Sequence, residues 1–292
     1  MTAEPLYATP RSDRATAGHR VAEIADRLGT PLMEWQRRVV DVALEVDGNT
    51  FAHRNVTITT PRQVGKSTLV GAVILDRLLA HPGSIVLFGA QTRMTARSKL
   101  LDEWWPRIRN TDLGDEFSLS RGAGFEALRH ENGSILRLLS SEESSGHGES
   151  VDLVVLDEGW ALEPHVEQAV RPATIRRPGA QVWCCSTAGT DRSVWWRGKV
   201  DAGRQAVTEG TDAVCFFEWS APMDANPADP ATWYGCHSAL AEGMVGEEVL
   251  AADYEALPES EFTRAYLNWW TSDLLDTGWT VIDQDAWKRA KG

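Results

Sequence analysis

The stretch TITTPRQVGKSTLVGAVIL, Thr57–Leu75, places a glycine-lysine-serine triplet between an alternating, strand-like run and an apolar helical run. Strand, glycine-containing loop and helix start follow one another in the order that a phosphate-binding P-loop requires. Aligned with G-x-x-x-x-G-K-[ST], the loop runs from Thr60 to Ser67, with Thr60 in place of the first glycine. Loop amides and the helix N-terminus would face phosphate, Lys66 would reach the β and γ oxygens, and Ser67 would bind magnesium. A surface loop with a solvated lysine is the alternative.

Two carboxylates, Asp157 and Glu158, end the very apolar run VDLVVLDE at 151–158. Ligands bind at the C-terminal edge of the strands in open α/β sheets. Asp157 can hold magnesium through water, and Glu158 can orient and deprotonate a water that attacks a γ-phosphate. An acidic turn after a strand is common, but the P-loop upstream favours a catalytic pair.

Two further segments carry polar groups suited to a nucleotide. Ser186, Thr187 and Ala188 follow the apolar run QVWCC, and hydroxyl groups there could sense whether a γ-phosphate is present. Upstream, Gln36 beside Trp35 could form a bidentate hydrogen bond with adenine. A plain turn and a surface glutamine on an amphipathic helix are the alternatives.

The remaining pattern predicts an α/β protein with a mostly parallel central sheet flanked by helices, and a small helical C-terminal region. Nearly uninterrupted apolar runs are typical of sheets that are covered on both faces, and Asn132-Gly133 predicts a hairpin turn within 125–139. The sequence predicts a polar, mobile start at 1–15, a core at 16–258 and a helical linker region at 259–292. Strands are expected at 55–60, 84–90, 151–158, 180–189 and 213–219, and helices at 19–29, 30–46, 66–81, 95–109, 164–175, 247–257 and 259–270.

Composition limits the class of protein. Acidic residues outnumber basic ones by 42 to 29 in 292 residues, a net charge of −13, which argues against nucleic-acid binding over the whole surface but leaves a local basic face open. The four cysteines lack C-x-x-C spacing, which favours a reducing cytoplasm over structural zinc. The sequence has no apolar run of signal-peptide or membrane-span character, so a soluble protein without a membrane partner is expected.

Several of these segments together resemble the ATPase domain of large terminase subunits from tailed double-stranded DNA bacteriophages. They are Trp35-Gln36, TTPRQVGKST, VDLVVLDE, CCSTAGT and FTRAYLNWW. The resemblance extends roughly over Leu32–Trp270 and covers the order of the motifs. In that family the P-loop commonly lacks its first glycine and carries an arginine before G-K-S/T, as Arg62 does here.

The resemblance implies a P-loop NTPase of the ASCE type, a magnesium-dependent ATPase that drives double-stranded DNA into a procapsid. The implied cofactors are ATP and Mg²⁺. The implied partners are DNA, the portal protein, the small terminase subunit and further copies of the chain in a ring, expected to be a pentamer, although the isolated domain's oligomeric state does not follow. The implied location is the host cytoplasm and, transiently, the procapsid portal.

By position, the resemblance makes Glu158 the catalytic carboxylate, makes Asp157 and Ser67 the residues that bind the metal, and makes Ser186 to Ala188 a coupling motif. Arg62 would stabilise charge on the phosphates from within the same subunit. The expected nucleotide contacts are Trp35, Gln36, Thr60, Pro61, Arg62, Gln63, Val64, Gly65, Lys66, Ser67 and Thr68.

The chain departs from the family in two places. Many relatives carry an arginine in the loop before the acidic strand, where this chain has Ser145-Gly146-His147-Gly148, so an arginine donated between subunits would be Arg121, Arg129 or Arg137. The end of the chain, DTGWTVIDQDAWKRAKG at 276–292, resembles the lead-in to an RNase H-like nuclease domain. We expect a chain cut at that boundary, without nuclease activity.

Two other functions fit parts of the pattern. A helicase-like, nucleic-acid-stimulated ATPase would need a second motor domain or further arginine motifs, and a nucleotide-gated scaffold would bind ATP without hydrolysing it. Basic clusters at 171–179 and 191–199 suit a nucleic-acid backbone, although solvated faces are the alternative. The expected DNA contacts are Arg176, Arg177, Arg192, Arg197 and Lys199.

Overall fold

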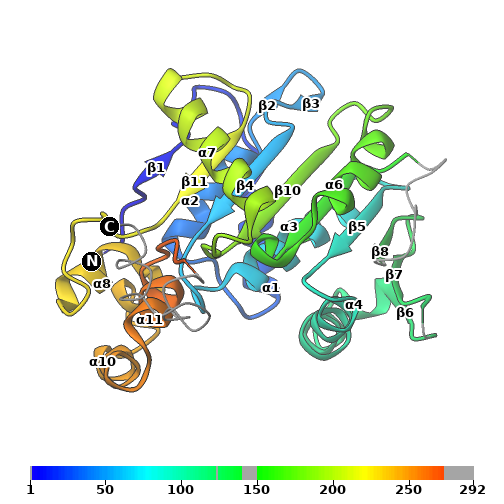
Figure 1. Ribbon diagram of the computed structural model, residues 1–292. Coiled ribbons are helices and arrows are strands. Elements are labelled where there is room, and N and C mark those ends of the chain that lie inside the picture. Colours follow the sequence, from blue (N-terminus) through cyan, green and yellow to red (C-terminus); the bar gives the residue numbers. More distant parts are fainter. Residues whose placement is uncertain (1, 123, 140–149, 273–292) are drawn as a thin grey trace, which may run out of the picture.

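Nine strands form one mixed sheet in the computed structural model, which describes residues 2–122, 124–139 and 150–272 (Figure 1). The central strands are parallel, whereas the outermost strand at one edge and the outer two at the other are antiparallel. In spatial order the strands are β1 (Tyr7–Ala8), β11 (Cys215–Glu218), β4 (Asn55–Thr59), β10 (Gln181–Ser186), β9 (Leu153–Asp157), β5 (Ile85–Gly89), β8 (Ile135–Leu138), β7 (Ala127–His130) and β6 (Phe117–Ser120). A separate short hairpin joins β2 (Val46–Asp47) to β3 (Thr50–Phe51).

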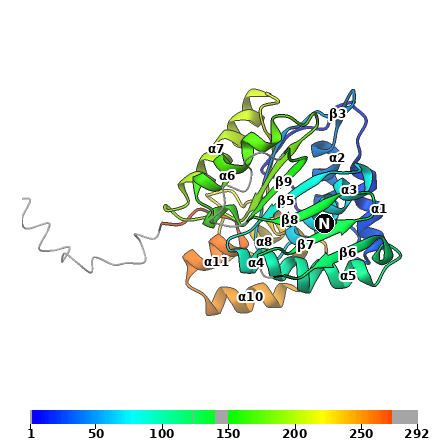
Figure 2. The same ribbon diagram turned by 90° about the vertical axis from the view of Figure 1, so that its right-hand side faces the viewer.

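Helices cover both faces of this sheet, as Figure 2 shows. The central strand β10 contributes Trp183 and Cys185 to the apolar core on one face and Val182 and Cys184 to the core on the other. Alternate residues of a strand point to opposite faces, and for this reason the run is apolar throughout. The first face is covered by α1 (Gly18–Arg27), α2 (Glu34–Ala43) and α3 (Lys66–Ala80), and the second by α6 (Pro164–Val170) and α7 (Val194–Glu209).

The expected α/β fold with a mostly parallel sheet is confirmed, and so is the hairpin turn at Asn132-Gly133 between β7 and β8. The prediction for the second helix was wrong at its start. Helix α2 begins at Glu34 rather than at Pro31, because the Gln36 side chain accepts a hydrogen bond of 2.8 Å from the Met33 amide and so caps the helix there.

The helix expected at 95–109 is divided into three parts. It consists of α4 (Arg93–Ser98), a π-helix (Lys99–Trp104) and α5 (Trp105–Arg109). Pro106 lies in the first turn of α5, and a proline has no main-chain N–H with which to complete an α-helical hydrogen bond. A single periodic pattern therefore conceals a change in helix type.

Residues 2–15 differ from the expected mobile start. Strand β1 pairs with β11, Ala3 and Thr9 are buried, and the Trp219 indole donates a hydrogen bond of 3.0 Å to the Ala3 carbonyl. Without β1, β11 would be an edge strand with unpaired main-chain groups. A two-residue strand is too short to give a periodic signal in the sequence.

The C-terminal helices form a unit with an apolar core of its own. This core includes Ala221, Trp233, Leu250, Phe262 and Leu267. The last helix, α11 (Glu259–Tyr266), therefore packs with the helices before it, whereas the sequence places the division at 258/259. The unit contains α8 (Pro230–Cys236), α9 (Ser238–Ala241), α10 (Glu247–Ala256) and α11 (Glu259–Tyr266).

None of the helices in the described ranges has the length and apolar character needed to cross a bilayer.

Candidate nucleotide-binding site

The P-loop lies between the end of β4 at Thr59 and the start of α3 at Lys66. Gln63 and Gly65 have positive φ angles of 56° and 88°. At Gly65 a side chain is excluded twice, because L-residues disfavour this conformation and because a Cβ atom there would lie 2.8 Å from Gln36 Nε2. The glycine of the motif is therefore required by both backbone shape and packing.

Trp35 and Gln36 support this loop from behind. The Trp35 indole donates a hydrogen bond of 3.0 Å to the Val64 carbonyl, and Gln36 Nε2 donates one of 2.8 Å to the Gly65 carbonyl. Both side chains are buried. The Gln36 amide thus uses both of its ends within the protein, and its expected contact with adenine stays a prediction that requires an exchange of these bonds.

Lys66 is buried and connects the P-loop to the segment after β10. Its Nζ donates hydrogen bonds of 2.8 Å to the Pro61 carbonyl and 3.2 Å to the Thr187 hydroxyl. Burial lowers the pKa of Lys66, an effect that the nearby carboxylates of Glu158 and Asp157 oppose. The lysine and one member of the expected coupling motif are therefore in direct contact.

Ser67 and Asp157 lie on either side of a cation that the sequence did not identify, Lys99. Its Nζ lies 2.8 Å from the Ser67 hydroxyl and 2.5 Å from Asp157 Oδ2. Burial lowers the pKa of Lys99, but the charges of Asp157 and Glu158 outweigh it and the net effect raises the pKa. A hydroxyl and a carboxylate oxygen on one cation are the hard donors that magnesium prefers, so these residues fit the expected metal.

Glu158 follows β9 with a φ angle of 56°, in the left-handed region. A non-glycine residue there is strained, and such strain is frequent at functional sites. Its Oε2 accepts a hydrogen bond of 2.8 Å from the Trp160 indole. The carboxylate faces a cavity of about 520 Å³ lined by Arg62, Gln63, Gly65, Lys66, Ser67, Gln91, Glu158 and Trp160.

The segment Ser186 to Ala188 contacts the P-loop, the turn that follows the acidic strand, and the residues that follow α11. The Ser186 hydroxyl accepts a hydrogen bond of 3.0 Å from the Trp160 amide, and the Ala188 amide donates one of 2.6 Å to Asn268 Oδ1. Asn268 Nδ2 also donates hydrogen bonds of 3.0 Å to the Thr59 hydroxyl and to the Trp219 carbonyl. Asn268 therefore joins the ends of three strands, a role that its place in FTRAYLNWW did not reveal.

Arg62 reaches the same cavity and is held through its main chain. Its amide donates a hydrogen bond of 2.7 Å to the Ala265 carbonyl, and the His237 ring lies 3.2 Å from the Arg62 carbonyl through Nε2. Burial lowers the pKa of His237 to about 4. The ring is therefore neutral at pH 7, and Nε2–H donates to Arg62 because Nδ1 accepts from the Leu240 amide.

The structure does not bring the five expected DNA contacts together. Arg176 and Arg177 precede β10 and Arg192 follows it, so these residues lie towards opposite ends of that strand, whereas Arg197 and Lys199 belong to α7. Some of the five side chains also make contacts within the chain. These contacts include Arg177 with Asp152 at 3.6 Å, Lys199 with Glu167 at 2.5 Å, and Arg197 at 4.1 Å from the centre of the Trp270 ring.

Of the three candidates for an arginine donated between subunits, Arg121 and Arg129 are exposed. Arg129 and Arg137 line a cavity beside β7 and β8. The loop at 145–148 and the C-terminal segment at 276–292 lie outside the described residues, so both remain predictions.

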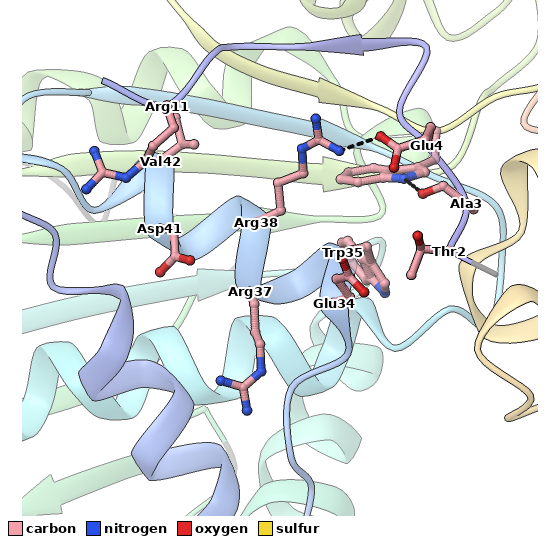
Figure 3. A pocket seen from close by; sticks show the side chains of 11 residues that line it. Thr2, Ala3, Glu4, Arg11, Glu34, Trp35, Arg37, Arg38, Asp41 and Val42 are labelled. Atoms are coloured by element: carbon pink, nitrogen blue, oxygen red, sulfur yellow. Dashed lines mark hydrogen bonds and ion pairs between the residues drawn. The ribbon is translucent and has the colours of Figure 1, made fainter. Parts of the chain in front are cut away.

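A second cavity, of about 390 Å³, lies along α2 (Figure 3). It is formed by the N-terminal segment, α2 and Trp219, and an ion pair of 2.6 Å between Arg38 and Glu4 crosses it. The two cavities have no lining residue in common. Trp35 lies between them, since it lines this one and supports the P-loop of the other.

The strand order also defines the class of fold. β10 lies between the P-loop strand β4 and the acidic strand β9, which together with the loop geometry is the arrangement of a P-loop NTPase of the ASCE type. No family model and no curated protein matches the chain, but solved structures do.

The large terminase of bacteriophage HK97 superposes with a TM-score of 0.73 and 19% identity, over 87% of this chain and 55% of that one. The large terminase ATPase domain of Thermus phage P74-26 gives 0.57 and 17%, over 88% and 98%. The large terminase of a thermophilic bacteriophage, in complex with ATP-γ-S, gives 0.57 and 9%, over 82% and 53%. The fold is thus that of large terminase ATPase domains, and the chain spans about half the length of the HK97 protein and of the thermophilic phage protein.

Proposed function

We propose that the chain is the ATP-hydrolysing motor domain of a large terminase subunit and powers the translocation of double-stranded DNA into a procapsid. One observation carries the proposal: Lys66, Ser67 and Glu158 line one cavity at the C-terminal ends of β4 and β9, and Asp157 lies beside it, joined to Ser67 through Lys99. The fold shared with phage terminases supports the motor, and the structures of the thermophilic phage terminase with ADP and with ATP-γ-S support the nucleotide.

The residues of the site divide the chemistry among them. Lys66 and the loop amides bind the phosphates, and Glu158 orients the attacking water and accepts its proton. Magnesium, held by Ser67 and Asp157, would supply positive charge to the β and γ oxygens. Arg62, at the wall of the same cavity, stabilises the charge that develops on the γ-phosphate.

The contact between Lys66 and Thr187 offers a route from hydrolysis to movement. The Lys66 ammonium group donates a hydrogen bond of 3.2 Å to the Thr187 hydroxyl. A phosphate that binds Lys66 would compete with Thr187 for this donor. Thr187 lies between Ser186 and Ala188, which are bonded to Trp160 and Asn268. A change at Lys66 would therefore be transmitted to the C-terminal helical unit that carries Asn268.

The partners follow from the same proposal. They are double-stranded DNA, the portal protein, the small terminase subunit and further copies of this chain in a pentameric ring, at the procapsid portal in the host cytoplasm. The ring needs only a few basic residues of each subunit to face its channel, which is compatible with a net charge of −13.

The test is steady-state ATP hydrolysis with magnesium for the wild type, Lys66→Ala and Glu158→Gln, with nucleotide binding measured on the same samples. We expect Glu158→Gln to retain binding and to lose turnover by about 100-fold or more, since general bases contribute about 10²–10⁴-fold. Lys66→Ala should weaken binding as well. Glu163→Gln removes the same charge from an exposed residue near the site and should leave the rate unchanged.

The outcomes separate the motor from the other two functions. Wild-type protein that binds ATP but never hydrolyses it, even at high protein concentration or with DNA, would favour a nucleotide-gated scaffold. Stimulation by single strands rather than by duplex DNA would favour a helicase-like ATPase.

A further inference from the structure

Lys99 occupies the place that the proposed function assigns to magnesium. Its Nζ lies 2.8 Å from the Ser67 hydroxyl and 2.5 Å from Asp157 Oδ2. The pair is removed from solvent, because the side chains of Lys99 and Asp157 are 12% and 1% exposed. The positive charge of Lys99 therefore neutralises the Asp157 carboxylate.

The ammonium group and the metal cannot occupy this place together. Magnesium binds oxygen ligands at about 2.0–2.1 Å in an octahedral arrangement that it rarely relaxes. An ammonium group bonded to the same two oxygens takes lone pairs that the metal needs. The two cations would also repel each other strongly in a site with little solvent.

Lys99 comes from a segment whose conformation is unusual. It is the first residue of the π-helix Lys99–Trp104, and π-helical turns are rare and are frequent at functional sites. The other end of this π-helix is also bonded to Ser67, because the Trp104 indole donates a hydrogen bond of 3.3 Å to the Ser67 carbonyl. Both ends of the segment thus depend on the position of the residue that would bind the metal.

We propose that Lys99 acts as an internal substitute for magnesium, which holds Ser67 and Asp157 together in the nucleotide-free protein and is displaced when magnesium and nucleotide bind. This inference rests on the proposed function of the site. Displacement changes the contacts of the π-helix between α4 and α5, so these elements respond to occupancy of the metal position. Because the metal must compete with Lys99, its apparent affinity is lower than the site would otherwise give.

The experiment measures binding of a fluorescent ATP analogue as a function of free Mg²⁺, for the wild type, Lys99→Met and Arg97→Met. In Lys99→Met the Mg²⁺ concentration for half-maximal binding should fall by about tenfold, within the roughly 5–150-fold range typical of coupled binding events. Arg97→Met is the matched control. Arg97 lies in α4, on the turn before Lys99, and it too is a cation paired with a buried carboxylate, that of Glu126. The Mg²⁺ requirement of Arg97→Met should equal that of the wild type.

The results distinguish the inference from the function on which it rests. If the wild type binds the analogue with magnesium and Lys99→Met needs as much Mg²⁺ or more, Lys99 does not compete with the metal and the inference is wrong, while the ATP site stands. If the wild type fails to bind at any Mg²⁺ concentration, the proposed function itself fails.

A second variant covers the case in which Lys99→Met does not fold without metal. Lys99→Gln is neutral but can still donate hydrogen bonds to Asp157, and it should show the same lower Mg²⁺ requirement. Thermal melting gives a readout independent of the nucleotide: magnesium should raise the melting temperature of either variant more than that of the wild type. An equal rise in all three proteins would contradict the inference.

Discussion

Asn268 is the residue at which we expect the largest effect from a change outside the cavity. Its side chain accepts a hydrogen bond of 2.6 Å from the Ala188 amide and donates bonds of 3.0 Å to the Thr59 hydroxyl and the Trp219 carbonyl. The residue is 2% exposed and has a φ angle of 58°. Asparagine is one of the few residues other than glycine that adopts this conformation readily.

The change Asn268→Ala leaves at least two buried main-chain groups without their partner, the Ala188 N–H and the Trp219 carbonyl. Each unsatisfied buried group costs about 1–3 kcal/mol, and the left-handed backbone adds about 1–2 kcal/mol for alanine. We therefore expect the free energy of unfolding to fall by about 3–8 kcal/mol, a change measured by urea denaturation followed by circular dichroism.

Asn268→Gly is the control that separates these two contributions. It loses the same hydrogen bonds but adopts a positive φ angle without strain, so it should be about 1–2 kcal/mol more stable than Asn268→Ala. ATP turnover should also fall at temperatures where either variant remains folded, because Ala188 follows Thr187, which contacts Lys66. A loss of stability below about 1 kcal/mol for Asn268→Ala would refute this account of the residue.

Three further predictions concern stability and DNA binding. Burial holds His237 neutral and lowers its pKa to about 4, from an ordinary 6.5. Its contribution to the free energy of unfolding is complete above pH 6.5 and is lost as the pH falls towards 4. Urea unfolding should therefore show that the protein is about 2 kcal/mol less stable at pH 5 than at pH 8, a difference that His237→Gln lacks. In α7, Gly203→Ala should destabilise the protein by about 1–3 kcal/mol, because the new Cβ atom would overlap the ring of the buried Phe216. Gly198→Ala should stabilise it by about 0.5–1 kcal/mol, because a Cβ atom there would have no other atom within 4 Å. Thermal or urea unfolding that gave both changes the same sign would contradict this packing. For DNA binding, Arg192→Ala should reduce the slope of log affinity against log salt concentration by about one. Arg176→Ala, at the opposite end of β10, should leave the slope unchanged. Equal slopes for the wild type and Arg192→Ala would show that Arg192 does not contact DNA.

Local patterns in the sequence contain some features of the fold and omit others. The P-loop could be predicted because strand, loop and helix start are consecutive, and the glycine at position 65 is required by the backbone of the loop itself. The acidic strand β9 could be predicted because burial on both faces makes it apolar throughout and leaves polar residues only at its end. Periodicity failed for β1, which is too short, and at the π-helix, where the type of helix changes without a change in pattern.

The sequence by itself therefore determined the class of fold and the residues that follow one another around the phosphates, since these depend on contacts between near neighbours in the chain. Only the tertiary structure decided that Lys99 lies between Ser67 and Asp157, that Trp160 holds Glu158, and that Asn268 bonds to Ala188. Sheet order brings the ends of β4, β10 and β9 to one edge, and side chains from remote helices reach that edge. A periodic pattern records that a segment has a buried face, but not which other segment buries it.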